Sequence, residues 1–268
     1  MAGLAQALLV AAMVVTATPA KDTPSGRVDG EAAAFYGEYV VSFYGLSIAS
    51  SSFRSSFGGD RFAMEGKLSS VGLARIFDST TASVTVKGRF AGSNPRPEGY
   101  SVSYTSGGKA KRTALSFSGG RVSGVVNEPP LKKRGKDWVP VTGKHLASVT
   151  DPISAVLVRA ESLDDVCGRT VSVFDGELRA DLKLGAGKRG NVDTGAYSGE
   201  AVTCGARFVP VAGYRPGNKS MAWLRDHGEI TVTFAPLGKT GIYAPIHATV
   251  GTQIGTITLA ARRLESRE

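Results

Sequence analysis

The chain has 268 residues, of which 42% are hydrophobic and 21% charged, and its formal net charge is +9. This length fits one large domain or two small ones, and the apolar content excludes an intrinsically disordered chain. Glycine accounts for 34 residues, which disfavours a mainly helical protein because each glycine inside a helix costs roughly 1 kcal/mol relative to alanine.

The chain begins with the pattern of a secretory signal peptide. An unbroken apolar run covers Leu8–Val15, and the small residues around Pro19 follow it as a cleavage signal. The run is shorter than the ~20 residues that a membrane-spanning helix needs, so an uncleaved N-terminal anchor is the less favoured alternative. We predict a signal peptide at 1–20, a flexible leader at 21–35 and an exported mature protein.

Short alternating segments, broken by glycine, follow the leader. Their period-two pattern of apolar and polar residues predicts β-strands with one buried face. Hairpin turns are predicted at 58–60 and 118–120, where Gly-Gly pairs occur. In the first half of the chain, the predicted strands are 38–44, 46–57, 61–68, 81–90, 99–104, 110–117 and 121–126.

A basic, proline-rich loop lies between the two halves, at 127–140. Lysine and arginine near an anionic membrane surface contribute about 1 kcal/mol each, and tryptophan favours the membrane interface. We therefore predict contact with an anionic membrane surface. An acidic glycan is a second candidate, a solvated loop without a partner is the plainer alternative, and export argues against nucleic acid. The residues concerned are Lys132, Lys133, Arg134, Lys136 and Trp138.

One segment, 150–160, departs from the strand pattern and predicts an α-helix. Thr150 or Asp151 can cap its first turn, and Pro152 suits the first helical position. A lone amphipathic helix in a β-rich chain usually covers an open end or face of the sheet. A weaker helical turn is predicted at 220–225. The apolar face of the first helix would comprise Ile153, Val156, Leu157 and Ala160.

The second half of the chain repeats the strand pattern. Asp175-Gly176 marks a tight hairpin turn, and the glycine-rich, basic stretch 185–190 is interpreted as a flexible hairpin tip. With about twelve to fourteen strands spaced roughly ten residues apart, the chain predicts a curved antiparallel sheet or barrel. The predicted strands here are 169–174, 177–184, 208–211, 229–234, 246–250 and 255–264.

Export favours a disulfide between the two cysteines, Cys167 and Cys204, because disulfides form in oxidising compartments. A bond between them would close a loop of about 38 residues and stabilise the fold by roughly 4 kcal/mol. The alternatives are two free thiols or a redox pair, although redox pairs usually have Cys-x-x-Cys spacing. A structural disulfide is therefore the prediction.

Residues with catalytic potential are few. The three histidines lack metal-binding spacing, so no metal or cofactor is predicted, and neither a nucleophile elbow nor a phosphate-binding loop is present. Acid–base chemistry would fall to Asp164, Asp165, Asp226 and His227, which would have to share one cleft. The chain is therefore predicted not to be an enzyme, and a hydrolase of envelope glycan or lipid is the least favoured alternative.

The segment Cys167–Leu182 resembles the signature of the domain-of-unknown-function 3108 family of exported bacterial envelope proteins. Its hairpin reads Phe-Asp-Gly-x-x-Arg-x-Asp-Leu over 174–182, and similarity extends to 39–46, 150–153 and 204–214. The resemblance covers roughly 36–264 and implies one β-rich domain over that range. It implies a mainly β fold with a single large curved antiparallel sheet, a half-barrel or β-spiral, wrapped around one α-helix. The implied location is the periplasm of a Gram-negative bacterium.

Together these observations predict a periplasmic, non-enzymatic binding or chaperone-like protein. An incompletely closed sheet leaves an apolar cavity, which could hold a lipid or a hydrophobic segment of an envelope protein. The alternative is a structural envelope-integrity protein that acts by protein contacts and fills its interior with its own side chains. The candidate ligand-lining residues, each of which could instead pack the core, are Phe43, Phe62, Phe90, Tyr104 and Phe117.

Overall fold

A computed structural model of the chain describes residues 33–72, 75 and 79–267. The predicted signal peptide and most of the predicted leader lie outside these described residues. The first strand begins at Ala33, so the end of the predicted leader belongs to the sheet. No helix in the described ranges is long and apolar enough to cross a membrane.

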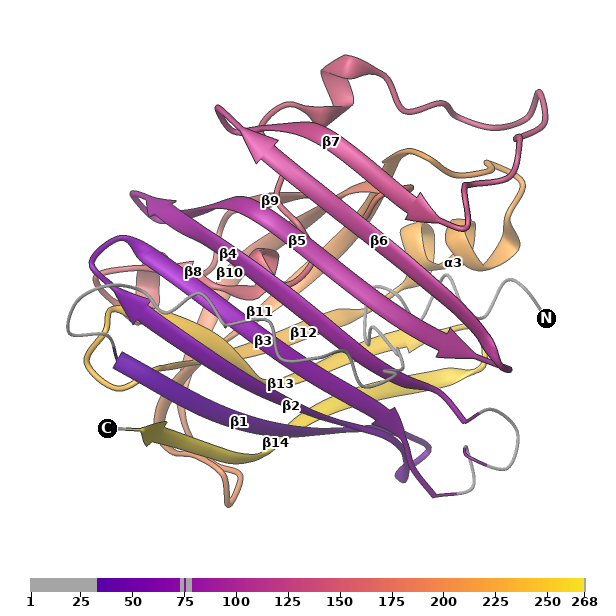
Figure 1. The fold of residues 1–268 in the computed structure, drawn as a ribbon. Helices are drawn as coiled ribbons and strands as arrows, with labels where there is room; N and C mark the ends of the chain where they lie inside the picture. The colour runs from indigo at the N-terminus through magenta and orange to yellow at the C-terminus, as the bar shows by residue number, and fades with distance from the viewer. Residues whose placement is uncertain (1–32, 73–74, 76–78, 268) are drawn as a thin grey trace.

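The described residues form fourteen strands in one antiparallel sheet, which confirms the predicted mainly β fold (Figure 1). The order across the sheet is β7-β6-β5-β4-β3-β2-β1-β14-β13-β12-β11-β10-β9, and β8 pairs with β13. The edge strands β7 and β9 do not pair with each other, so the sheet is not closed. The bounds are β1 Ala33–Phe43, β2 Leu46–Gly58, β3 Arg61–Ser70, β4 Thr81–Ala91, β5 Asn94–Ser106, β6 Lys109–Ser118, β7 Arg121–Glu128, β8 Val158–Arg159, β9 Thr170–Phe174, β10 Arg179–Asp193, β11 Ser198–Ala212, β12 Ile230–Pro236, β13 Ile242–Thr252 and β14 Gly255–Arg267.

The main core lies between the two halves of the sheet, which are joined where β1 pairs with β14. Figure 1 shows β1–β7 as the front layer and β9–β14 behind it. In β4, alternate side chains such as Val84, Val86 and Phe90 point inward and are buried, as period-two patterning requires. They belong to a cluster that also contains Phe174 and Ala244 from the other half.

The segment between the two halves bridges the gap between the edge strands. At one side, the N–H of Ser148 donates to the carbonyl of Gly120, in the β6–β7 turn, over 2.8 Å. At the other side, the N–H of Thr150 donates to the carbonyl of Ser172 in β9 over 2.8 Å. The carbonyl of Thr150 also accepts the N–H of Phe174. This short connection therefore satisfies part of an edge that would otherwise be open to other strands.

The predicted helix at 150–160 is wrong. The chain forms a single 3₁₀ turn, η2, at Ser154–Val156 and then the short strand β8. Asp151 caps the turn as expected, since its Oδ1 accepts the N–H groups of Ile153 and Ser154, each over 2.9 Å. Pairing of Thr150 with β9 on one side and of β8 with β13 on the other holds the flanking backbone extended, and this overrides the helical pattern.

The weaker helical turn predicted at 220–225 is the one α-helix among the described residues, α3, at Lys219–His227. The side chain of Asn218 caps it by accepting the N–H of Met221 over 3.1 Å. Met221 and Leu224 are buried against β11, β12 and β13, in a cluster that includes Phe208 and Ile230. Two further 3₁₀ turns are η1 at Gly143–Leu146 and η3 at Leu163–Asp165.

The predicted disulfide is present. Cys167 and Cys204 are bonded, with their Cα atoms 5.7 Å apart, and they tie the segment after η3 to β11. The stretch 185–190 is not a hairpin tip, because β10 continues through it with a bulge to Asp193. Gly187 lies against the disulfide: a Cβ there would be 2.7 Å from Cys167 Sγ, so this strand needs a glycine at that point.

Candidate functional site

An apolar cavity of about 390 Å³ lies along the line where β1 pairs with β14, between the two halves of the sheet. Its walls come from β1–β5, from β13 and β14, from the segment around η2 and from the turns that follow β10 and β12. The volume falls within the ~300–1,000 Å³ that is typical of small-molecule sites. The interior of the protein is therefore not completely filled by its own side chains.

The cavity is elongated along the strands. Its lining runs from Phe35 to Val41 on β1 and from Leu259 to Ser266 on β14. At ~3.3 Å per residue, the β1 stretch of the lining is ~20 Å long. The space is therefore a channel, and we call it the channel below.

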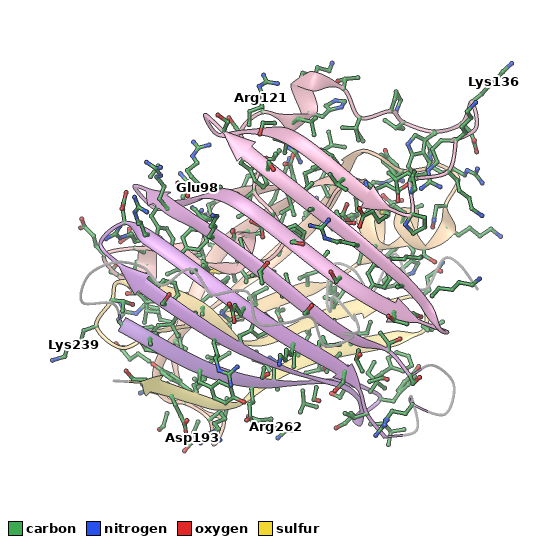
Figure 2. The ribbon with its side chains drawn as sticks, viewed as in Figure 1. Glu98, Arg121, Lys136, Asp193, Lys239 and Arg262 are labelled. Carbon is green, nitrogen blue, oxygen red and sulfur yellow. A yellow bond between two sulfur atoms is a disulfide. The ribbon has the colours of Figure 1, made fainter. Side chains whose placement is uncertain are left out.

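The two ends of the channel differ in their surroundings. The start of β1, the end of β14, the turn near Tyr197 and the turn at Gly238 surround the open end, where Gly238 is exposed. In Figure 2, Lys239, next to Gly238, lies at the left edge of the molecule. At the other end, the lining residue Val41 belongs to a buried cluster that contains Ile257. A ligand would enter from the side where β1 begins.

Two glycines keep the channel open. A Cβ at Gly66 would lie 2.5 Å from Phe53 Cε1 and 2.8 Å from Val84 Cγ1, and a Cβ at Gly37 would lie 3.0 Å from Tyr39 Cε2. The rings of Phe53 and Tyr39 therefore lie along the sheet over these glycines, with their centroids 5.9 Å apart in an edge-to-face contact. Because the rings lie against the wall, they do not fill the centre of the channel.

Six side chains with hydroxyl groups line this otherwise apolar space, and two of them, Tyr36 and Tyr197, donate to Glu38 and to the carbonyl of Glu200. Tyr39, Ser51 and Ser55 all belong to the lining, and none of the three makes a side-chain hydrogen bond with the described residues. Tyr39 and Ser51 are direct register partners on β1 and β2. Burial raises the pKa of Tyr39 to about 12, so this phenol stays neutral.

None of the five aromatic residues predicted to line a ligand site lines the channel. Phe62, Phe90 and Phe117 are buried in the main core, and Tyr104 packs against the same cluster. Phe43 packs against the buried cluster that contains Val41. Their position agrees with the alternative that they pack the core. Alternation identifies inward-facing side chains, but it does not show which of them face a filled interior and which face open space.

The channel-lining residues that the sequence reasoning missed include Tyr39, Phe53 and Gly66. One signal was available: Gly66 falls inside a predicted strand, and a glycine in a strand interior often marks the close approach of another group. Which group approaches depends on the pairing of Phe53 with Gly66 across two strands. That register is a property of the folded sheet, and the local pattern does not contain it.

The basic loop lies at the opposite end of the sheet from the opening of the channel, and none of its residues lines the channel. Lys136 projects at the far right of Figure 2. Arg134 forms an ion pair with Glu177, and its guanidinium lies 4.5 Å from the ring centre of Trp138. Lys132, Lys133 and Lys136 are exposed and form no ion pair within the described part of the chain.

The candidate acid–base residues lie on two elements: Asp164 and Asp165 on η3, where Ser162 Oγ donates to Asp165 Oδ2 over 2.8 Å, and Asp226 and His227 on α3. Asp164, on η3, pairs with Arg189 over 3.1 Å, and Asp226, on α3, pairs with Arg225 over 2.7 Å. The ring of His227 stacks on Trp223. None of these side chains lines the channel. Within the described ranges, no three His, Cys, Asp or Glu side chains are grouped so that they could hold a metal ion.

Comparison with known proteins assigns the family. Residues 38–262 match the family described as "Protein of unknown function (DUF3108)". The chain belongs to the DUF3108 family. No curated protein sequence matches it. A crystal structure of a beta-barrel-like protein of the DUF1849 domain from Brucella abortus is similar over 88% of this chain and 98% of that one, with 8% identity and a TM-score of 0.48.

In this DUF3108 protein, the hairpin that carried the family resemblance has a structural role. Oδ1 of Asp175 accepts the N–H groups of Glu177 and Leu178 over 2.9 and 2.7 Å, which fixes the turn between β9 and β10. The carbonyl of Gly176 accepts the side-chain amide of Asn127 on β7 over 3.1 Å. The turn therefore links β9 to the opposite edge of the open sheet.

The arginine and second aspartate of the same hairpin extend this polar network. Arg179 Nη2 donates to Ser172 Oγ over 2.8 Å, and Ser172 Oγ donates to Asp181 Oδ1 over 2.7 Å. Nη1 of Arg179 lies 2.8 Å from the same carboxylate, and the arginine is buried. These DUF3108 signature residues hold β9 against β10 and do not line the channel.

Asp151 carries a buried carboxyl group next to the channel wall, one residue before the lining residue Pro152. Its Oδ1 caps η2, but Oδ2 is buried without a hydrogen-bond partner. Burial raises the pKa of Asp151 to about 6, against the opposing effect of the hydrogen bonds from Ser154 and Ile153. Burial raises the pKa of Asp175 to a similar value. Both groups therefore favour the protonated form in mildly acidic solution.

Proposed function

We propose that this DUF3108 protein binds an apolar, chain-shaped ligand, such as a lipid or an acyl chain, in its channel. The observation that carries the proposal is a cavity of about 390 Å³ whose lining is mostly apolar and extends along β1 and β14. A hydrocarbon chain that enters this space loses its contact with water, which contributes about 25 cal/mol per Å² of apolar surface.

The construction of the channel supports binding over a purely structural role. An envelope-integrity protein that acts only by contacts has no need of an open interior, and voids in a core weaken a fold. Here Gly37 and Gly66 occupy positions where a side chain would displace an aromatic ring. The alternative of a structural protein is disfavoured for this reason.

The proposed place of action is the periplasm. The N-terminal apolar pattern of the sequence supports export, and the Cys167–Cys204 disulfide is consistent with an oxidising compartment. The proposed role is non-enzymatic, since it requires only that the channel take up and release its ligand. A hydrophobic segment of an envelope protein is the alternative ligand for the same channel.

The experiment is native mass spectrometry of the mature protein purified from its own periplasm, with extraction and analysis of bound lipids. We expect a stoichiometric lipid or acyl species. The matched variants are Ser55→Phe, which places a ring in the channel, and Ser56→Phe, which places it on the other face of β2. Ser55→Phe should lose the bound species and Ser56→Phe should keep it. An empty wild-type protein that takes up no lipid on titration would refute the proposal.

A second candidate function is contact with an anionic surface through the basic loop. The observation that favours it is that Lys132, Lys133 and Lys136 are exposed and unpaired within the described residues, while Arg134 is held by Glu177 and Trp138. Three exposed cations on a projecting loop suit a membrane with anionic headgroups. Contact through this loop would hold the protein with the opening of its channel facing away from that surface.

A further inference from the structure

Two of the polar groups of the channel, Tyr39 and Ser51, lie part-way along its wall. Tyr39 and Ser51 face each other across β1 and β2, and the Tyr39 hydroxyl lies 3.5 Å from the position of a Cβ on Gly37. Phe35 and Leu264 line the channel on the side of the opening, and Val41 lines it at the other end. Ser55, the register partner of Phe35, adds one hydroxyl near the opening. A ligand chain would therefore pass Ser55 first, then the paired hydroxyls of Tyr39 and Ser51, and then hydrocarbon.

These hydroxyls have no partner of their own. Neither Tyr39 nor Ser51 makes a side-chain hydrogen bond with any described residue, although Ser51 is 7% exposed and Tyr39 lies against the channel wall. Both oxygens open onto the channel, since neither is among the fully enclosed polar atoms that lack a partner. A ligand chain that filled the channel would remove water from them, and a polar group that loses water without gaining a hydrogen bond is destabilising. A pair of free hydroxyls inside an apolar channel is therefore a place where a ligand oxygen would be stabilised.

The chemistry of the wall indicates that this oxygen is uncharged. No lysine, arginine or histidine side chain among the described residues forms a hydrogen bond or an ion pair with Tyr39 or Ser51. The nearest charged lining residues, Lys67 and Glu265, lie on neighbouring strands, Lys67 exposed to solvent and Glu265 at the opening. An ionised carboxylate or phosphate at the depth of Tyr39 would be buried without a counter-ion, which is strongly unfavourable.

We propose that the ligand chain carries a neutral hydroxyl group part-way along its length, and that Tyr39 and Ser51 bind its oxygen. This inference rests on the proposed function, because it assigns the ligand class of the same channel. Tyr39 would donate its hydroxyl proton to the ligand oxygen, and Ser51 can donate or accept. The groups at either end of the ligand are not recognised by these residues.

The test uses displacement of an environment-sensitive fluorescent fatty-acid probe from the mature protein. The competitors are a long-chain fatty acid methyl ester and its counterparts that carry one hydroxyl at different carbons of the chain. One position of the hydroxyl should give binding roughly three- to tenfold tighter than the unsubstituted ester, which is the effect expected of one neutral hydrogen bond. Other positions should bind no better than the unsubstituted ester.

The variants Tyr39→Phe and Ser51→Ala should each reduce this preference, which is measured as the ratio of the two affinities within each variant, so a change in the affinity for the unsubstituted ester does not affect the result. Ser52→Ala, on the other face of β2, is the matched control and should keep the preference. If the unsubstituted and hydroxylated esters bind equally, or if the preference survives in both variants, the inference is overturned and the channel still binds chains. If no ester displaces the probe, the proposed function itself fails.

Discussion

The ring of Phe53 lies over Gly66, its register partner on the neighbouring strand, so closely that a Cβ on Gly66 would be 2.5 Å from the ring edge. The two residues depend on each other, because the ring of Phe53 occupies the space that a side chain on Gly66 would need. Val84 on β4 closes the same spot from the other side. The open space of the channel depends on this arrangement.

We expect Gly66→Ala to force the ring of Phe53 away from the wall and into the channel. Overpacking of this kind costs typically 1–3 kcal/mol, and the displaced ring would also reduce uptake of an apolar probe. Denaturant unfolding and probe binding measure the two effects. Gly205→Ala is the control, because a Cβ at Gly205 in β11 meets no atom within 4 Å. Equal probe binding by Gly66→Ala and the wild type would contradict the role given to this glycine.

The buried carboxyl groups predict an unusual dependence of stability on pH. The pKa of Asp151 is raised from 3.8 to about 6 in the folded protein, so folding favours its protonated form. The stability that this proton contributes is present at low pH and is lost as the pH rises through about 6. Asp175 acts in the same direction.

From Asp151 alone, the free energy of unfolding should be roughly 1 kcal/mol larger at about pH 5 than at about pH 8. Asp151→Asn keeps an oxygen that can cap η2 but removes the titrating group, so it should flatten this part of the profile. Urea unfolding at several pH values measures the change. A wild-type profile that falls towards about pH 5, or one that the substitution leaves unaltered, would show that Asp151 is ionised in the fold.

The disulfide is expected to provide a large part of the stability. The double substitution Cys167→Ser with Cys204→Ser should lower the free energy of unfolding by roughly 4 kcal/mol, because the unfolded chain regains the freedom of a loop of about 38 residues. Thermal unfolding with and without a reducing agent gives an independent comparison for the wild type. The variant should show no response to the reducing agent, and a wild type that also shows none would contradict the prediction.

The exposed lysines of the basic loop predict salt-dependent binding to anionic vesicles. Replacement of Lys132, Lys133 and Lys136 by glutamine should lower the apparent affinity by about 3 kcal/mol at most, at ~1 kcal/mol per charge. Vesicle co-sedimentation with phosphatidylglycerol measures it. The control changes Lys87, Lys144 and Lys239 to glutamine, which removes the same charge from exposed positions elsewhere. Equal loss in both triple variants would mean that only the net charge matters.

The sequence predicted most of the sheet and little of the site. The segment 81–90 was predicted from alternation and corresponds to β4 at Thr81–Ala91, because a strand with one buried face shows its period locally. The segment 150–160 was wrongly predicted as a helix. Its apolar residues have helical spacing, but Thr150 pairs with β9 and β8 pairs with β13, and the local pattern does not contain these partners from elsewhere in the chain. The channel arises from contacts such as Phe53 with Gly66, which exist only once the strands are in register.

The connection that bridges the edge strands also continues directly into the wall of the channel. Thr150 holds β9 through two backbone hydrogen bonds, and Ile153 and Leu157, a few residues later, line the channel. Local opening of this segment would therefore expose the amides of Thr150 and Phe174 and the interior of the channel in a single event. The exchange rates of these two amide protons should consequently report whether the channel is filled, since a bound chain must slow the opening that releases them.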